Sequence, residues 1–151
     1  MRDQLLDLVS HIHDLGCIDF IKITGSDDKT DISGLASDKS VVINANFNSP
    51  VKDFSGTFGM RNLSNLKGLL NIAEYGAEGQ ITVKRQDRNN EKDAPVGLYF
   101  QNKNNDFNND YRFMVSEVVN DALANVNFKG ATWNIEFNPS DLDLQRLKMQ
   151  S

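Results

Sequence analysis

Histidine and cysteine, the side chains best suited to nucleophilic or metal chemistry near neutral pH, are scarce in this 151-residue sequence. His11 and His13 stand two positions apart in a segment of helical spacing, so they point to different sides of a helix and do not form a shared metal site. The single cysteine, Cys17, has no evident catalytic partner, and we interpret it as a small buried hydrophobe. One cysteine excludes an internal disulfide and fits a reducing cytoplasm.

Two further patterns resemble binding motifs superficially. Asp27, Asp28 and Asp31 lie near an expected turn, but their spacing is not that of a calcium loop. Gly56 and Gly59 precede a helical segment as in a phosphate-binding loop, but they fall within a strand pattern, where glycine allows close backbone packing. The sequence has no G-x-S-x-G, phosphate-loop or H-E-x-x-H motif. We therefore expect a non-enzyme with no catalytic residue, metal site or cofactor.

The composition is that of an ordinary globular protein, with 39% hydrophobic and 25% charged residues. No apolar run approaches the ~20 residues of a membrane span, and we expect no membrane partner. The net charge of -5 argues against nucleic acid if it is taken as a sum. Only the distribution of charge over the surface decides binding, because an acidic face and a basic face can coexist.

The elements that would carry these residues begin with a helix. Leucine, valine and isoleucine recur at helical spacing over 2–15, and Gly16 is a suitable stop. β-branched and aromatic residues then predict strands over 17–24, 30–36 and 40–47, followed by a loop that crosses to the next strand.

A second unit of similar kind follows. Alternating apolar residues predict a strand over 54–60, and leucines at helical spacing predict a helix over 61–76. Further strands are expected over 79–86, 96–101 and 110–117, with the polar stretch 88–95 as a hairpin tip or loop. Each helix needs a sheet face for its apolar stripe, so we predict an α+β fold with two helices packed on antiparallel β-sheets.

The pattern changes after Glu117. Residues 118–130 have no clean period, so a helix and an irregular connector are both possible there. Trp133, Ile135 and Phe137 alternate and predict a strand over 131–137, followed by a helix over 138–151. One strand and one helix cannot bury their apolar faces alone. We predict a complete domain over 1–115, a connector over 116–130 and an incomplete second domain over 131–151.

Two segments carry a resemblance to a known family. TFGMRNLSNLKGLLNIAEYGAEGQITVK, residues 57–84, resembles the sliding clamps of DNA replication. NVNFKGATWNIEFNPSDLDLQRLKM, residues 125–149, is similar to clamps of T4-like phages, particularly those that infect marine cyanobacteria. The order of elements before these segments also matches, so the resemblance covers essentially the whole chain.

The resemblance implies a DNA clamp fold and a processivity factor that encircles duplex DNA without sequence preference. Its implied partners are a DNA polymerase and a clamp loader, and its implied location is the cytoplasm of an infected bacterial host. Family members form closed rings, and a full-length form of this protein is expected to form a trimeric ring. They also continue through a complete second domain, so we expect this chain to be a truncated form that does not close a ring.

In the family, helices line the hole around the DNA, and the resemblance therefore also implies which cations would approach phosphate. These DNA-binding candidates lie on or beside the expected helices: Arg2, Arg61, Lys67, Arg146 and Lys148. A solvated protein face would explain each of them as well, and the first helix also carries Asp3, Asp7 and Asp14.

A β-rich phage structural or adhesion module is the alternative from a different functional class. Such a module is typically an all-β sandwich and needs no pair of helices. A clamp needs two helices on the same sheet face and a terminal strand and helix that begin the unit again.

Overall fold

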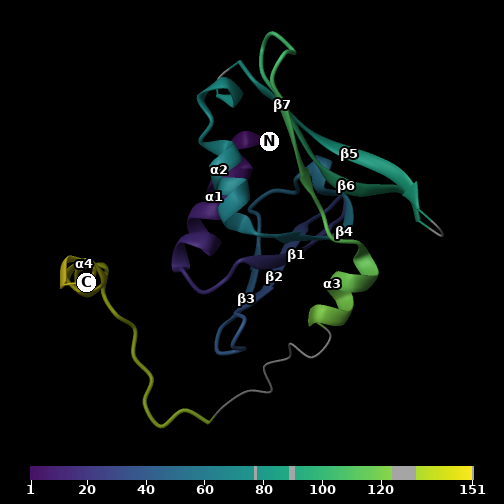
Figure 1. Cartoon of the computed structure of the whole chain (residues 1–151). Coiled ribbons are helices and arrows are strands. Elements are labelled where there is room, and N and C mark those ends of the chain that lie inside the picture. Colours follow the sequence, from purple (N-terminus) through teal and green to yellow (C-terminus); the bar gives the residue numbers. More distant parts are fainter. Residues whose placement is uncertain (77, 89–90, 124–131, 151) are drawn as a thin grey trace.

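A computed structural model describes the whole chain except residues 77, 89–90, 124–131 and 151 (Figure 1). It confirms the α+β class with antiparallel sheets. The α-helices are α1 Arg2–Ile12, α2 Leu63–Leu70, α3 Ser116–Leu123 and α4 Asp141–Gln150. Short 3-10 turns occur at η1 His13–Leu15, η2 Lys52–Phe54 and η3 Ala73–Tyr75. The strands are β1 Phe20–Gly25, β2 Thr30–Leu35, β3 Val42–Asn46, β4 Gly56–Arg61, β5 Gln80–Arg88, β6 Glu91–Gln101 and β7 Asn108–Arg112.

Two antiparallel sheets meet along β4. The first has the strand order β3-β2-β1-β4 and the second the order β5-β6-β7. An isolated antiparallel bridge pairs Gly59 in β4 with Met114, two residues beyond β7. Phe58 and Phe113, next to these residues, stack at 4.2 Å between ring centroids inside the core. The two sheets therefore form one continuous wall.

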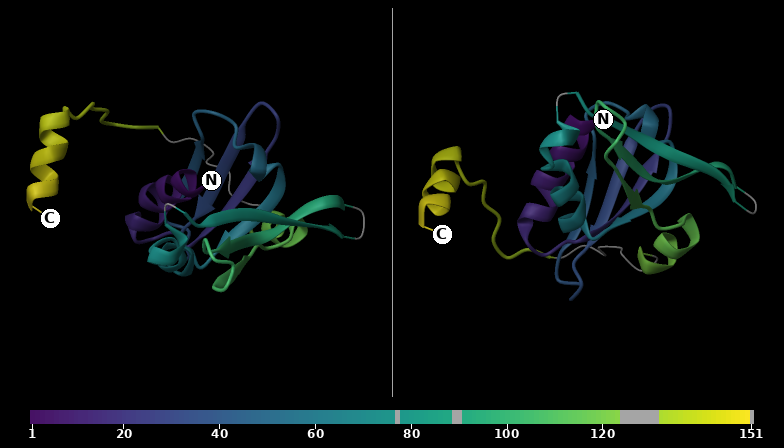
Figure 2. Two further views of the ribbon diagram at one scale, coloured as in Figure 1. Left: turned by 90° about the horizontal axis from the view of Figure 1, so that it is seen from above. Right: turned by 45° about the horizontal axis from the view of Figure 1, so that its top comes forward.

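The first two helices lie side by side on one face of this wall (Figure 2). They run antiparallel, because Arg2 at the start of α1 donates from Nη2 to the carbonyl of Leu70 at the end of α2, at 2.8 Å. Their apolar stripes share one core with the inward strand residues. That core includes Leu5, Leu8, Val9, Ile12, Leu63, Leu66, Leu69, Leu70, Ile21, Ile23, Ile32, Phe58 and Met60.

The start of α2 is fixed by side chains that accept its unpaired backbone N–H groups. Asn62 takes a left-handed conformation, with φ 59°, and its side-chain oxygen accepts from the Asn65 N–H at 3.2 Å. Asp19 accepts from the Ser64 N–H at 3.2 Å. Asparagine is the residue most tolerant of this conformation after glycine, and it is a preferred N-cap. This cap ties α2 to the chain just before β1.

Helix α3 covers the opposite face of the wall (Figure 2). Val119 is fully buried, and a Cβ atom placed on Gly59 would lie 3.0 Å from the Val119 side chain. Strand residues alternate between faces, so Phe58 and Met60 point to α1 and α2 whereas Gly59 points to α3. Residues 116–123, predicted as the start of a connector, are thus a helix packed on β4 and β1.

The predicted strand over 131–137 is wrong for the residues that the structure describes. Residues 132–137 have no regular structure, and Trp133, Ile135 and Phe137 are 69%, 80% and 78% exposed. Alternation alone does not make a strand, because a strand needs a neighbouring edge for its backbone hydrogen bonds. The helix that follows, α4, stands apart from the folded body in each view (Figures 1 and 2).

Other boundaries also differ from the prediction. The polar stretch 88–95 is mostly strand, because β5 extends to Arg88 and pairs with Glu91 at the start of β6; residues 89–90 lie outside the described part. The last predicted strand, 110–117, gives way to α3 at Ser116. Helix 61–76 is shorter than expected and ends at Leu70. Cys17 is exposed rather than buried.

Among the described residues, no helix combines the length and the hydrophobicity that a membrane crossing requires.

Candidate functional site

The solvent-exposed side of the paired helices α1 and α2 carries more negative than positive charge. Asp3 and Asp7 on α1 are exposed, and Asp14 follows in η1. The cation opposite them is Lys67 on α2, whose Nζ lies 2.7 Å from Asp14 Oδ1, with both side chains a little under half exposed. Lys67 is therefore already paired with a carboxylate, and exposed Asp3 and Asp7 add negative charge to the same surface.

Arg2 serves the contact between the two helices. Its Nη2 donates to the Leu70 carbonyl at 2.8 Å, and its Nε is buried without a hydrogen-bond partner. A cation at a helix C-terminus is stabilised by the helix dipole and by the unpaired carbonyls there. Arg2 therefore lies on the predicted helical surface but is committed to α2, with little of its charge available to a ligand.

Arg61 lies on the other face of the wall from the two helices. It pairs directly with Phe20 across β1 and β4, and both side chains point outward, opposite to Met60 and Ile21. The sequence contained the signal for this placement, because Phe58 and Met60 mark the buried face of the strand and Arg61 is out of phase with them. Arg61 does not converge with Arg2 and Lys67.

Arg146 and Lys148 lie on α4, away from the paired helices (Figure 1). Both are exposed, and Arg146 Nη1 lies 3.8 Å from Asp143 Oδ1 one turn earlier. The structure therefore does not bring the five candidate cations together on one surface. Arg2 and Lys67 share the helical face, Arg61 is on the sheet face, and the α4 pair stands separately.

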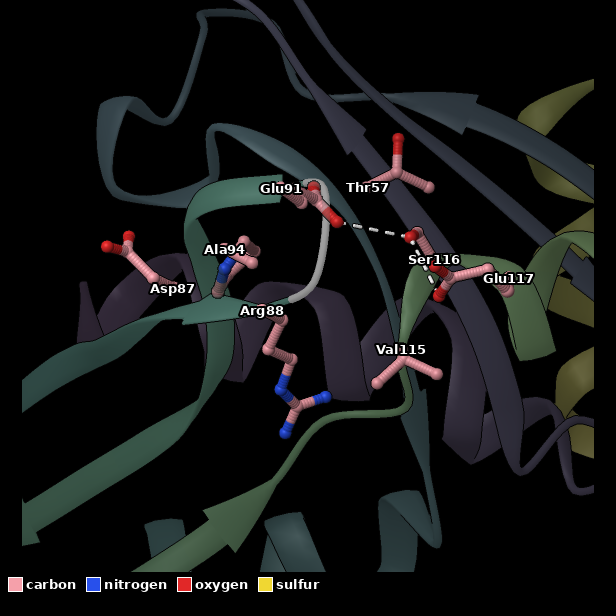
Figure 3. A pocket seen from close by; sticks show the side chains of 9 residues that line it. Thr57, Asp87, Arg88, Glu91, Ala94, Val115, Ser116 and Glu117 are labelled. Carbon is pink, nitrogen blue, oxygen red and sulfur yellow. Dashed lines mark hydrogen bonds between the residues drawn. The ribbon is translucent and has the colours of Figure 1, made fainter.

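A pocket of about 450 Å³ opens between the β5–β6 hairpin and the start of α3 (Figure 3). Ser116 Oγ lies 3.2 Å from Glu91 Oε2 and 3.3 Å from Glu117 Oε2, and a hydroxyl has one hydrogen to donate to one of them at a time. Arg88 points away from both carboxylates in Figure 3. The pocket lining contains no histidine that could act as a base for Ser116.

A second, larger depression of about 800 Å³ lies on the outer face beside α3. Apolar side chains line it together with two cations, Lys39 and Arg61, and one carboxylate, Asp19. The lining includes Cys17, Phe20, Leu35, Ala36, Arg61 and Leu123. Such a groove suits an apolar segment with an acidic flank.

No protein-family model matches the sequence, and no curated protein matches it. The positions of the helices, charges and grooves must therefore support any functional assignment. Over the described ranges, no group of three or more histidine, cysteine, aspartate or glutamate side chains is placed to hold a metal ion.

The sequence reasoning missed a set of cations on the outer face of the second sheet. Lys84, Arg88 and Arg112 line a notch of about 350 Å³ there. Each of the three follows the polar phase of its strand, so its outward direction was readable from the alternation. The alternation does not predict that the three lie close together, because this depends on the register of strands that are far apart in the chain.

Proposed function

We propose that this chain acts as a DNA sliding clamp, a polymerase processivity factor of the kind that T4-like phages use. The observation that supports this most is the antiparallel pair α1 and α2, packed side by side on the same face of an antiparallel wall. An all-β structural or adhesion module has no need for such a pair. A rigid layer of helices backed by a sheet is suited to line a hole through which duplex DNA passes.

The order of elements adds support. Helix α1 is followed by the antiparallel strands β1, β2 and β3, and α2 is followed by the antiparallel strands β5, β6 and β7. The chain thus builds the same helix-and-three-strand unit twice, with β4 joining the halves. When the same unit is repeated, the sheet can continue with even curvature around an axis.

The exposed charges of the helical face allow only weak contact with DNA. With Asp3, Asp7 and Asp14 exposed and Lys67 already paired, affinity for phosphate from this face is low. The tether would therefore come from encirclement, and contact with the duplex would be loose enough for sliding. Arg146 and Lys148 remain proposed DNA contacts, whereas Arg61 is better placed for a protein partner.

Partner docking is proposed for the outer face. The groove beside α3 is lined by apolar residues that include Phe20 and Leu35, and its charged residues are Lys39, Arg61 and Asp19. A polymerase or a clamp loader would insert an apolar segment with acidic flanks there. The ring, proposed to be a trimer of a form with two complete clamp domains, would work in the cytoplasm of an infected bacterial host.

The test measures topological retention on DNA. A full-length relative is incubated with a T4-like phage polymerase and clamp loader on nicked circular DNA and then passed through a sizing column before and after the circle is linearised. Retention that is lost on linearisation, together with longer extension products, is the expected result. Equal behaviour on circles and linear DNA, with no change in product length, would reject the proposal.

The β-rich structural or adhesion module remains the second candidate, and the acidic helical face is the observation that favours it. A surface that repels phosphate is expected of a module that meets no DNA. Failure of the retention test, combined with a stable association with other virion proteins, would support this candidate.

A further inference from the structure

The outer face of the second sheet carries a row of residues brought together by strand register. Lys84 in β5 pairs with Gly97 in β6, and Gly97 pairs with Arg112 in β7. Directly paired residues point to the same face, so the two cations flank a position that has no side chain. They stand two strand spacings apart, about 9–10 Å. The result is a notch with a backbone floor and cationic walls.

The face of the sheet on which this notch lies is fixed by the bridge to β4. Gly59 pairs with Met114 and faces α3, and Arg112 is two residues before Met114, in the same phase. The residues in the opposite phase, Tyr111 and Phe113, are buried in the core. The notch therefore lies on the side of the wall opposite to α1 and α2, and is separate from their acidic surface.

The notch has an excess of positive charge. Its lining includes Lys84, Arg88 and Arg112 against the single carboxylate of Asp110. Asp110 is engaged by Lys84, with Nζ to Oδ1 at 2.6 Å, which leaves both arginines without a carboxylate partner among the described residues. Two guanidinium groups around a small cavity can bind the oxygens of a phosphate in fork geometry.

An aromatic ring adjoins the cations. Tyr99 pairs with Asp110 on the same outward face, and Lys84 Nζ lies 4.4 Å from the centre of its ring. A partly exposed aromatic ring beside backbone-binding cations, on an open sheet, is the arrangement that single-stranded nucleic acids use, since a base can stack while its phosphate is neutralised. A carboxylate-bearing peptide would use the cations but would gain nothing specific from the ring.

We propose that this outer notch binds single-stranded nucleic acid, with Arg88 and Arg112 on phosphate and Tyr99 beneath a base. When the strand binds, Lys84 exchanges its contact with Asp110 for phosphate and uncovers the ring. The proposal is independent of the sliding clamp, because it uses the opposite face of the wall. Its test is therefore independent of the test for retention on circular DNA.

Fluorescence anisotropy with a labelled oligothymidylate of about 15 nucleotides at low salt provides the test. Arg112→Gln and Arg88→Gln should each weaken binding about tenfold. Tyr99→Leu should weaken it about tenfold through lost stacking. Asp110→Asn should tighten it, which misfolding cannot mimic. Lys52→Gln, which removes one positive charge in η2, is the matched control and should leave the affinity nearly unchanged.

Two further measurements identify the ligand. The affinity of the unaltered protein should fall with salt with a logarithmic slope of about -2, as expected for three single-strand phosphate contacts. Unlabelled oligothymidylate should compete well, and a polyglutamate of equal charge or a duplex of equal length should compete poorly. The proposal is overturned if polyglutamate or duplex competes equally, or if all four notch variants bind as Lys52→Gln does.

Discussion

Arg85 connects the two sheets, and its replacement tests how the wall is held together. Its guanidinium donates from Nη2 to the Ser55 carbonyl at 3.0 Å, to Ser55 Oγ at 2.8 Å and to the Asp53 carbonyl at 3.0 Å. It also donates from Nη1 to the Asp93 carbonyl at 2.8 Å. The side chain of Arg85 is 22% exposed. A single residue of β5 thus fixes both the segment before β4 and its own hairpin.

The expected effect of Arg85→Met follows from these contacts. Charge-assisted hydrogen bonds contribute about 1.5–3 kcal/mol each, but they are not additive. The acceptors at Asp93 and Asp53 are exposed, so water replaces the arginine there at little cost. The contacts at Ser55 are partly buried and dominate. We expect a loss of roughly 2–4 kcal/mol in the free energy of unfolding, or about 6–15 °C in melting temperature.

Urea denaturation followed by circular dichroism measures this loss, with Arg88→Met as the control. Arg88 lies on the same strand, and its side chain makes no hydrogen bond to another described residue. Its replacement should change the free energy of unfolding by less than about 0.5 kcal/mol. An equally small change for Arg85→Met would refute the view that this arginine joins the sheets.

Three other predictions concern charge, pH and backbone approach. Asp14→Asn releases Lys67 and should tighten binding of duplex DNA about two- to fivefold at low salt, measured by anisotropy; no change would weaken the clamp proposal. Burial raises the pKa of the Tyr111 hydroxyl, so the folded state keeps a proton that the unfolded chain loses above about pH 10. Above that pH the free energy of unfolding should therefore fall by about 1.4 kcal/mol per pH unit. Tyr111→Phe, which deletes the hydroxyl bonded to the Arg61 carbonyl, should remove that component of the alkaline decline in urea titrations. Gly25→Ala should destabilise the fold by roughly 3 kcal/mol or more in the same assay, because its Cβ would overlap the backbone carbonyl at the end of η2.

The two helices of the core were predictable because their burial is periodic. Leu5, Leu8 and Ile12 follow the helical repeat, and the same holds for Leu63 and Leu66 in α2. Helix α3 was not predictable from periodicity, since only Val119 and Leu123 are buried along it. Two buried positions do not define a stripe. Its packing depends on the space above Gly59, which no local pattern reveals.

Strand alternation reports which residues share a face, but not what covers that face. The alternation of Trp133, Ile135 and Phe137 is as regular as that of β1, yet these residues are exposed and form no β-strand. A strand exists only where a partner edge supplies hydrogen bonds. Similarly, Lys67 and Asp14 are 53 positions apart, so their ion pair follows from helix packing and not from either helix alone.

The net charge of -5 does not show how individual exposed charges are divided between the two faces of the wall. The exposed carboxylates of Asp3 and Asp7 lie on the helical side, whereas Arg61 and Arg112 lie on the sheet side. Since salt screens exposed charges beyond about 10 Å, each face acts on a ligand almost separately. A nucleic acid strand attracted to the sheet face would therefore not be drawn to the helices. The same separation would let a duplex pass the helical side without being held, which sliding requires.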